Sequence, residues 1–311
     1  MLNIIQKRKY TYIFSATLVV ISIVLLLTQG LKLGRDFKGG TLLEVQFTPK
    51  TVAGEKKQSD FKSPSRDEIL KKLSDLKLKD LMVQPSNNNK FILRYMASDE
   101  NLNEQVLQKL GEFGDNVQKL RVDFVGASIS KQLKKKAVWA IVLAVVGIAG
   151  YIAWAFRKVS YPIASWQYGV GAIIALAHDI IITLGAFVLL GKFYGVEIGI
   201  PFIAALLTIL GYSVNDTIVV YDRIRENLIK SNSKENFENI VNKSIKETLA
   251  RSINTSATVI FVLLTMILFG GESIKYFSIA LLIGVGFGTY SSIFVASALL
   301  VSSYNFNLKK G

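Results

Sequence analysis

The sequence lacks cysteine entirely and has a single histidine among its 311 residues. Without cysteine there can be no disulfide bond, no thiolate nucleophile and no cysteine-ligated zinc, and one imidazole excludes a metal site built on several histidines. A Walker-type lysine motif is also missing, so bound ATP is not an expected source of energy. These absences exclude thiol chemistry and metal sites built on cysteine or on several histidines, and ATP-driven function is not expected.

Hydrophobic residues make up 50% of the chain and gather in long apolar runs. The runs lie at 12–28, 137–156, 169–190, 198–220, 253–269 and 276–302. Each has about 17 residues or more, enough to cross a bilayer as a helix. The first has no small-residue cleavage site and is interpreted as an uncleaved helix rather than a signal peptide. The sequence therefore predicts an α-helical polytopic membrane protein with six transmembrane helices.

Basic residues are distributed unevenly around these runs. Lys and Arg number 37 against 23 Asp and Glu, an excess that in a soluble protein would suggest nucleic-acid binding. In a membrane protein the distribution of these residues indicates which side of the membrane each loop lies on. Only Lys192 and Lys275 lie in the short loops on one side. The other side holds Lys7, Arg8, Lys9, Arg157, Lys158, Arg223, Arg225, Lys230, Lys234, Lys243, Lys246, Arg251, Lys309 and Lys310. The basic side is expected to be cytoplasmic, with both termini.

The runs and charges divide the chain into four parts. We expect 1–30 to be a cytoplasmic N-terminus with the first helix, and 31–136 to be an exported domain. A five-helix bundle is expected at 137–304, with a cytoplasmic connection at 221–252, and a cytoplasmic tail at 305–311.

Apolar residues recur at helical spacing inside the 221–252 connection, between lysines and glutamates. They are Phe237, Ile240, Val241, Ile245 and Leu249. The pattern predicts an amphipathic helix that lies on the membrane surface or, as the alternative, against a partner.

The exported segment alternates between strand and helix patterns. Strand patterns cover 41–47, 81–84, 90–96 and 117–125. Helix patterns follow Asn101 and Ser65, where Glu68 three residues on completes a capping box. The order β-α-β-β-α-β predicts a ferredoxin-like α+β domain. Residues 50–63 between the first strand and helix are charged, contain Gly and Ser, and are predicted to form a mobile loop.

The ferredoxin-like scaffold supports many functions and identifies none. This copy contains no histidine and no recognisable pair of acids, so we do not expect an enzyme. Two interpretations stay open: a surface that touches a polypeptide or partner domain, or a spacer.

Polar residues inside apolar runs are costly in a membrane, so each is a functional candidate. The fourth run and the start of the fifth contain Asn215, Asp216, Thr217, Arg251, Asn254 and Thr255. Asn254 and Thr255 share a helix face with Arg251, and an Asp216–Arg251 pair is geometrically reasonable. Burial favours the neutral form of a carboxyl group, whereas a nearby guanidinium or water favours the ionised form. Asp216 is thus predicted to bind and release a proton; the alternative is a static ion pair joining helices.

The third run carries a second candidate, His178-Asp179. His178 is interpreted as a packed histidine hydrogen-bonded within the bundle, and Asp179 as a secondary proton-binding candidate. The sixth run carries Gly284 and Gly288, a spacing that lets helices approach closely. We expect ordinary packing within the bundle there.

Five segments together resemble the SecF family. They are Asp36-Phe-Lys-Gly-Gly40, His178-Asp179, the string from Gly211 to Asn227, Arg251-Ser-Ile-Asn-Thr-Ser256, and the string from Gly284 to Ser292. The likeness spans nearly the whole chain in the same order. The 211–227 string is the most specific part.

The resemblance implies one half of an RND-superfamily bundle, with a SecD-like six-helix subunit as the other half. It implies an auxiliary subunit of the Sec translocase that uses the proton-motive force to promote preprotein export across the bacterial inner membrane. A SecYEG-type translocon, unfolded preprotein and membrane lipids would be partners, and nucleic acid would not. Residues 31–136 would be periplasmic.

On the same resemblance, Asp216 and Arg251 match positions linked to proton coupling. Asp36, Gly39 and Gly40 match the turn into the exported domain. No cofactor is implied beyond the ion gradient, and Na⁺ in place of H⁺ stays open. Two alternatives remain: half of an RND-type small-molecule or lipid exporter, and a non-transporting scaffold of the translocon. Single-chain exporters of that type have two large exported domains, whereas this chain has one.

Overall fold

The computed structural model describes residues 4–48, 63–86, 89–96, 101–113, 116–157, 163–231 and 235–308. The chain divides into two compact units, one of residues 1–32 and 137–311 and the other of residues 33–136. Residues 50–62 of the loop predicted at 50–63, and the lysines at 158, 234, 309 and 310, lie outside the described residues.

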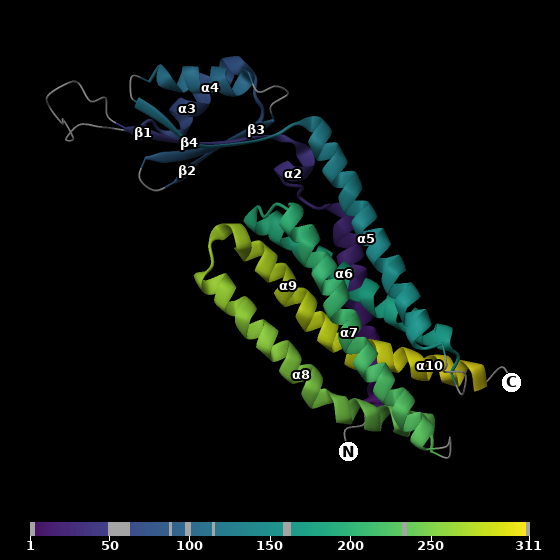
Figure 1. The fold of residues 1–311 in the computed structure, drawn as a ribbon. Helices are drawn as coiled ribbons and strands as arrows, with labels where there is room; N and C mark the ends of the chain where they lie inside the picture. The colour runs from purple at the N-terminus through teal and green to yellow at the C-terminus, as the bar shows by residue number, and fades with distance from the viewer. Residues whose placement is uncertain are drawn as a thin grey trace. The chain divides into compact units, whose positions relative to one another are not determined.

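Long helices build the first unit (Figure 1). They are α1 (Arg8–Thr28), preceded by the short η1 (Ile5–Lys7), then α5 (Ala127–Ala155), α6 (Ser165–Tyr194), α7 (Ile200–Lys230), α8 (Phe237–Phe269) and α9 (Glu272–Ser291). The last continues through a π-helical segment, η3 (Ser292–Ala296), into α10 (Ser297–Leu308). Within the described residues, six helical runs are long and apolar enough to cross a membrane. The prediction of six spanning helices is confirmed.

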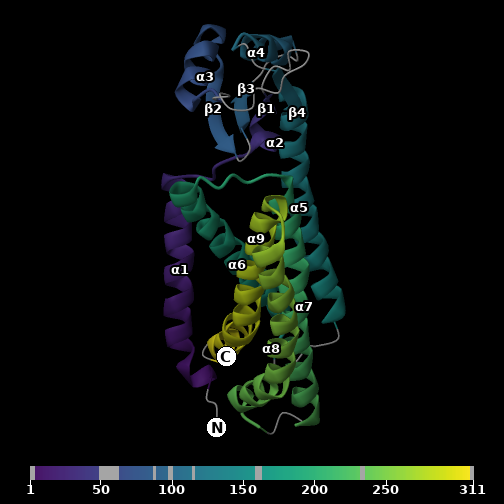
Figure 2. The ribbon, with the colours of Figure 1, turned by 90° about the vertical axis from the view of Figure 1, so that its left-hand side faces the viewer.

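The helices differ in how much surface they bury. About half of the spanning part of α6, α7 and the α9–α10 run is buried, whereas α1 and α5 leave most of theirs exposed. Figure 2 shows α1 and α5 at opposite edges of this unit. In the core the ring of Tyr168 stacks on Phe156 at 5.1 Å and meets Tyr221 edge-on at 5.3 Å. The buried middle of the bundle is therefore built by α6, α7 and α9.

The amphipathic segment after α7 has a different place from the predicted one. Its apolar side chains do not lie on a membrane surface: Phe237, Ile240, Val241 and Ile245 belong to the buried core of the helical unit, together with Ile224 of α7. The segment is the first part of α8, which runs unbroken to Phe269. An apolar stripe on a helix can be covered either by lipid or by protein. Here the end of α7 and α10 cover it.

The second unit contains a four-stranded antiparallel sheet with two helices on one face (Figure 1). Its elements are α2 (Arg35–Lys38), β1 (Gly40–Thr48), α3 (Arg66–Leu73), η2 (Ser74–Leu76), β2 (Lys79–Ser86), β3 (Lys90–Met96), α4 (Asn101–Gly111) and β4 (Asn116–Val125). The strand order is β2-β3-β1-β4. The helices and this order confirm the predicted ferredoxin-like α+β domain.

Alternation along β1 places Leu43, Val45 and Phe47 in the core between sheet and helices. Ser65 accepts a hydrogen bond from the Glu68 backbone and Glu68 reaches back, so the predicted capping box is confirmed. The buried Asn103 of α4 accepts hydrogen bonds from the hydroxyls of Thr41 at 2.8 Å and Tyr95 at 2.7 Å.

The chain enters this domain through a glycine turn. Asp36 lies in the one-turn helix α2, and the Gly39 N–H donates to the Arg35 carbonyl at 2.7 Å. Gly39 and Gly40 have φ values of 78° and 120°, which L-residues with side chains rarely adopt. A Cβ at Gly40 would also lie 2.6 Å from the Tyr95 carbonyl oxygen. Glycine is therefore required where β1 pairs with β3.

Candidate functional site

Asp216 lies inside the bundle where α7, α8 and η3 meet. Its side chain is 9% exposed, and both carboxylate oxygens accept hydrogen bonds. The Ser252 hydroxyl of α8 donates to Oδ1 at 2.6 Å, and the Ser292 hydroxyl of η3 donates to Oδ2 at 2.5 Å. A carboxylate held away from water needs such donors, because leaving it unpaired would cost several kcal/mol, on the order of the penalty for a buried ion.

Asp179 of α6 is fully buried and held in a similar way. Its Oδ2 accepts from the hydroxyls of Ser213 on α7 at 2.6 Å and Ser291 on α9 at 2.7 Å. Nδ1 of His178 lies 2.8 Å from Oδ1. The predicted role of His178 as a histidine hydrogen-bonded within the bundle agrees with this contact, but its Nε2 is buried without a partner among the described residues.

The two carboxylates receive hydroxyls from consecutive residues, Ser291 and Ser292, at the point where α9 passes into η3. Both serines are completely buried. Single π-helical turns within α-helices are rare and occur frequently at functional sites. The change of helical form begins where both carboxyl groups are contacted.

A chain of hydroxyl groups extends from the Asp216 site. The Tyr212 hydroxyl donates to Ser256 at 2.9 Å, and Ser256 is in contact with the hydroxyl of Thr289. Ser256 also donates to the Ser252 carbonyl at 2.8 Å. Polar groups of α7, α8 and α9 thus lie in one connected band inside the bundle.

The other predicted proton-coupling residues have different positions. Thr217 is buried and donates to the Ser213 carbonyl at 3.1 Å. Asn215, Arg251, Asn254 and Thr255 are exposed on α7 and α8. Polar side chains on the outside of membrane-spanning helices would be costly against lipid, so this face is suited to cover by protein or water.

Asp216 and Arg251 do not form the predicted pair. Among the described residues Arg251 makes no ion pair. Asp216 is instead bound by Ser252, the residue that follows Arg251 in the sequence. The physical reason is helix periodicity: neighbours in an α-helix point about 100° apart, so the face of α8 that presents Ser252 inward turns Arg251 outward. Arg251 lines a cavity of about 640 Å³ together with Trp154 of α5 and Asp222 of α7.

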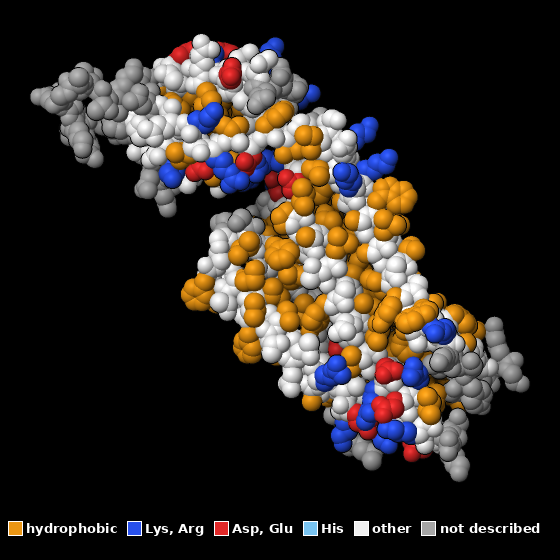
Figure 3. Space-filling view, in the orientation of Figure 1, with side chains coloured by type: hydrophobic (Ala, Val, Ile, Leu, Met, Phe, Trp, Pro, Cys, Tyr) orange, Lys and Arg blue, Asp and Glu red, His pale blue; other side chains and the backbone are white. Residues whose placement is uncertain are grey.

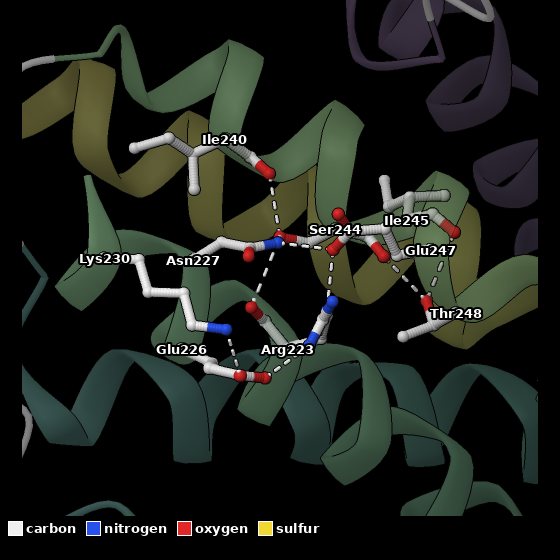
Figure 4. A network of polar contacts seen from close by, with 9 residues as sticks. All are labelled: Arg223, Glu226, Asn227, Lys230, Ile240, Ser244, Ile245, Glu247 and Thr248. Carbon is white, nitrogen blue, oxygen red and sulfur yellow. Dashed lines mark hydrogen bonds and ion pairs between the residues drawn. The ribbon is translucent and has the colours of Figure 1, made fainter.

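Charged side chains join α7 to α8 at the end of the helical unit that carries this cavity (Figure 4). The Arg223 guanidinium binds Glu226 at 2.5 Å and Glu247 at 2.6 Å. The Asn227 amide donates to Glu247 at 2.7 Å and to the Ser244 hydroxyl at 2.9 Å. In the view of Figure 3, Lys, Arg, Asp and Glu gather over this end, and hydrophobic side chains cover the middle of the unit.

Gly284 and Gly288 place α9 directly against α7. A Cβ at Gly284 would collide with Ile209, and one at Gly288 would press on Ser213. The close approach brings Ser213 and Ser291 to the same oxygen of Asp179. The two glycines therefore help to shape the carboxylate site.

Ser213, Ser252, Ser291 and Ser292 were not among the candidates predicted from the sequence. Small hydroxyl residues are common in packed membrane helices, so their presence alone is a weak signal. The stronger signal is that each buried carboxylate must have donors on neighbouring helices. Among the described residues, no group of three acidic or histidine side chains could hold a metal ion.

The structure is that of a multi-pass membrane protein, with a ferredoxin-like domain after the first helix in the chain. Buried carboxyl groups inside such bundles are typical of proteins that move ions or substrates. Comparison with known proteins identifies the family. Residues 105–305 match the family model of the protein export membrane protein SecD/SecF, C-terminal, and residues 24–51 match that of the SecD/SecF GG motif.

Curated relatives match over almost the entire chain. The protein translocase subunit SecF of Thermobaculum terrenum is 43% identical, with 98% of this chain and 95% of the relative covered. The protein translocase subunit SecF of Anaerolinea thermophila is 39% identical, with 97% and 94% covered. The chain belongs to the SecD/SecF family and, within it, to the SecF subunits.

Solved structures agree with this assignment. The crystal structure of SecDF, a translocon-associated membrane protein from Thermus thermophilus, superposes with a TM-score of 0.76 at 30% identity over 97% of this chain. A SecDF structure in a super-membrane-facing form gives a TM-score of 0.69 at 30% identity over 99% of this chain. This chain covers 38% and 39% of the length of those chains.

Proposed function

We propose that this protein is a non-enzymatic auxiliary subunit of the Sec translocase that promotes export of preproteins across the cytoplasmic membrane, driven by the proton-motive force. The observation that carries the proposal is Asp216, a nearly buried carboxyl group in a membrane-spanning helix whose two oxygens are each bound by a serine hydroxyl of a different helix. Membership of the SecF subunits supports the role in protein export.

Asp216 is suited to convert proton binding into a change of helix packing. As a carboxylate it accepts from Ser252 and Ser292; as a carboxylic acid it has one hydrogen to donate and can no longer accept equally at both oxygens. Its contacts with α8 and η3 therefore differ between the two forms. The proposal requires no cofactor beyond the ion gradient. Carboxylate and hydroxyl oxygens are also suitable ligands for Na⁺, so the experiment below compares a sodium gradient with a proton gradient.

A SecD-like six-helix subunit is proposed to cover the polar outer face of α7 and α8. Exposed Asn215, Arg251, Asn254 and Thr255 support this, because contact with a protein partner or enclosed water removes the cost of placing them against lipid. The SecYEG-type translocon, unfolded preprotein and membrane lipids complete the proposed surroundings.

The proposed orientation is supported by the basic residues near the helix ends. Arg8, Arg223 and Arg225 belong to the basic side, which supports cytoplasmic N- and C-termini in a bacterial inner membrane. Residues 31–136, with the ferredoxin-like domain, are then periplasmic, where they can contact emerging preprotein or a partner domain.

The test is preprotein translocation into proteoliposomes that contain the translocon, a SecD-like subunit and this chain, with and without a pH gradient. Asp216→Asn keeps the shape of the side chain and removes its titration, so the gradient-dependent part of translocation is expected to disappear. Asp222→Asn, an exposed carboxylate on the same helix, is the matched control and should retain it.

Co-purification with the SecD-like subunit shows whether the variant still assembles. An assembled Asp216→Asn complex with full gradient-dependent translocation would overturn the proton-coupled role and leave the scaffold interpretation. A sodium gradient at constant pH distinguishes Na⁺ from H⁺, and the release of small lipophilic cargo tests the exporter interpretation.

A further inference from the structure

Asp179 and Asp216 are held by one structural element. Asp179 Oδ2 lies 2.7 Å from the Ser291 hydroxyl, and Asp216 Oδ2 lies 2.5 Å from the Ser292 hydroxyl. Both serines are buried, and they are adjacent in the chain at the junction of α9 and η3. A shift of this junction therefore acts on both carboxyl groups.

Each of these serines has a second acceptor within reach. The Ser291 hydroxyl lies 3.1 Å from the Gly288 carbonyl oxygen, and the Ser292 hydroxyl lies 2.9 Å from that of Thr289. A hydroxyl has one hydrogen, so it donates either to the carboxylate or to the carbonyl one turn earlier. When the carboxyl group gains a proton it becomes the donor, and the serine hydrogen is free to turn to the carbonyl.

His178 provides a place for the proton that reaches Asp179. Nδ1 contacts Asp179 Oδ1 at 2.8 Å, while Nε2 is buried with no partner in the described part of the chain. The step starts from a neutral ring with its proton on Nδ1 and an ionised Asp179. A proton binds at Nε2, and the Nδ1 proton passes to Oδ1. The ring is then neutral with its proton on Nε2, and the carboxyl group is neutral. The His178–Asp179 pair gains one proton in total, and no other reactant is needed.

We propose that Asp179 is a second proton-binding carboxyl group of this bundle, coupled to Asp216 through Ser291 and Ser292. The inference extends the proposed function, since it assumes that Asp216 titrates. Protonation of one carboxyl group moves its serine, that movement alters the α9–η3 junction, and the altered junction changes the donor available to the other carboxyl group.

The remaining titratable and charged groups around the two sites are few among the described residues. Tyr290 of α9 stacks beside His178 at 6.1 Å. On the other side Tyr212 precedes Asp216 by one turn, and Arg251 precedes Ser252. The Tyr221 hydroxyl donates to the Ala296 carbonyl of η3 at 3.1 Å. None of these bridges the carboxyl groups. Ser213 of α7 donates to Asp179 but not to Asp216, so the adjacent Ser291 and Ser292 form the pair of hydroxyls that contacts both carboxyl groups.

The experiment is a pH titration of the carboxyl C=O bands by infrared difference spectroscopy, on the full chain with its SecD-like partner in lipid vesicles. Asp179→Asn and Asp216→Asn assign one band to each residue. The proposal predicts that Asp179→Asn moves the titration midpoint of the Asp216 band by about fivefold or more in proton concentration, the lower end of typical coupling between sites.

Serine variants test the route. In a Ser291→Ala or Ser292→Ala background, Asp179→Asn should move the Asp216 midpoint much less. Ser297→Ala is the matched control, because the buried Ser297 hydroxyl donates to the Ile293 carbonyl and contacts neither carboxyl group. In that background the full shift should persist.

An Asp216 midpoint that stays the same in Asp179→Asn, or the absence of any band that depends on Asp179, overturns the proposal. If Asp179→Asn does not assemble, Ser291→Ala alone, which leaves both carboxyl groups in place, must still move the Asp179 band. These readouts do not require translocation, so loss of the coupling and failure of the export function are separate results.

Discussion

Gly284 of α9 lies so close to Ile209 of α7 that a single added carbon at position 284 would collide with the isoleucine side chain. Gly286, two residues on, has open space at the corresponding position and is exposed. One helix thus offers a packed glycine and an unpacked one within a single turn.

Gly284→Leu is expected to destabilise the bundle by about 1–3 kcal/mol, because it must push α9 away from α7. The midpoint temperature of unfolding in mild detergent measures this. Gly286→Leu is the control and should leave the midpoint almost unchanged. Equal midpoints for the two variants would show that the α7–α9 contact is not tightly packed.

Gly40→Ala is expected to destabilise the ferredoxin-like domain by roughly 1–3 kcal/mol, because φ is 120° at this residue and the Tyr95 carbonyl lies where the methyl group would go. Hydrogen exchange of the β1 and β3 amides in the full chain should become faster. Gly111→Ala, at the open C-terminal end of α4, should not accelerate it. Unchanged exchange in Gly40→Ala would refute the steric account of this turn.

Tyr95 should titrate late. Burial raises the pKa of its phenol to about 12 from an ordinary value of 10.0. The neutral phenol is thus favoured in the folded domain, and its contribution to stability is complete below pH 10 and lost as the pH rises through about 12. The tyrosinate absorbance of the wild type minus that of Tyr95→Phe should appear near pH 12. A component at the ordinary value would mean that the phenol is open to water.

Glu247 should stabilise the α7–α8 hairpin. It accepts from Arg223 and from the buried Asn227, so Glu247→Gln is expected to cost about 1 kcal/mol. Faster hydrogen exchange over residues 237–249 would report this. Lys230→Gln removes a more exposed ion pair with Glu226 and should have less effect. A larger increase in exchange for Lys230→Gln than for Glu247→Gln would show that exposure does not decide the strength of these contacts.

Much of the fold could be predicted from the sequence because its signals are local. The capping box of Ser65 and Glu68 and the alternation of Leu43, Val45 and Phe47 depend on neighbours in the chain. The long apolar runs similarly indicate spanning helices. The segment from Phe237 to Leu249 was misplaced because an apolar stripe does not specify whether lipid or protein covers it.

The site was predictable only in part. Asp216 and Asp179 were found because a carboxyl group in an apolar run is unusual. Their serine partners were not, since Ser252, Ser291 and Ser292 reach them only through the register of separate helices. Arg251 was expected to pair with Asp216 because it opens the fifth apolar run, but helix periodicity instead places the adjacent Ser252 against that carboxylate.

The central claim is that Asp216 changes its protonation state during gradient-driven export. The most direct measurement is time-resolved infrared difference spectroscopy of the carboxyl C=O region in the reconstituted complex while it translocates preprotein. The account predicts a carboxyl band that rises and falls with turnover in the wild type and is absent in Asp216→Asn. An identical band in Asp216→Asn, or translocation with no carboxyl change at all, would contradict it.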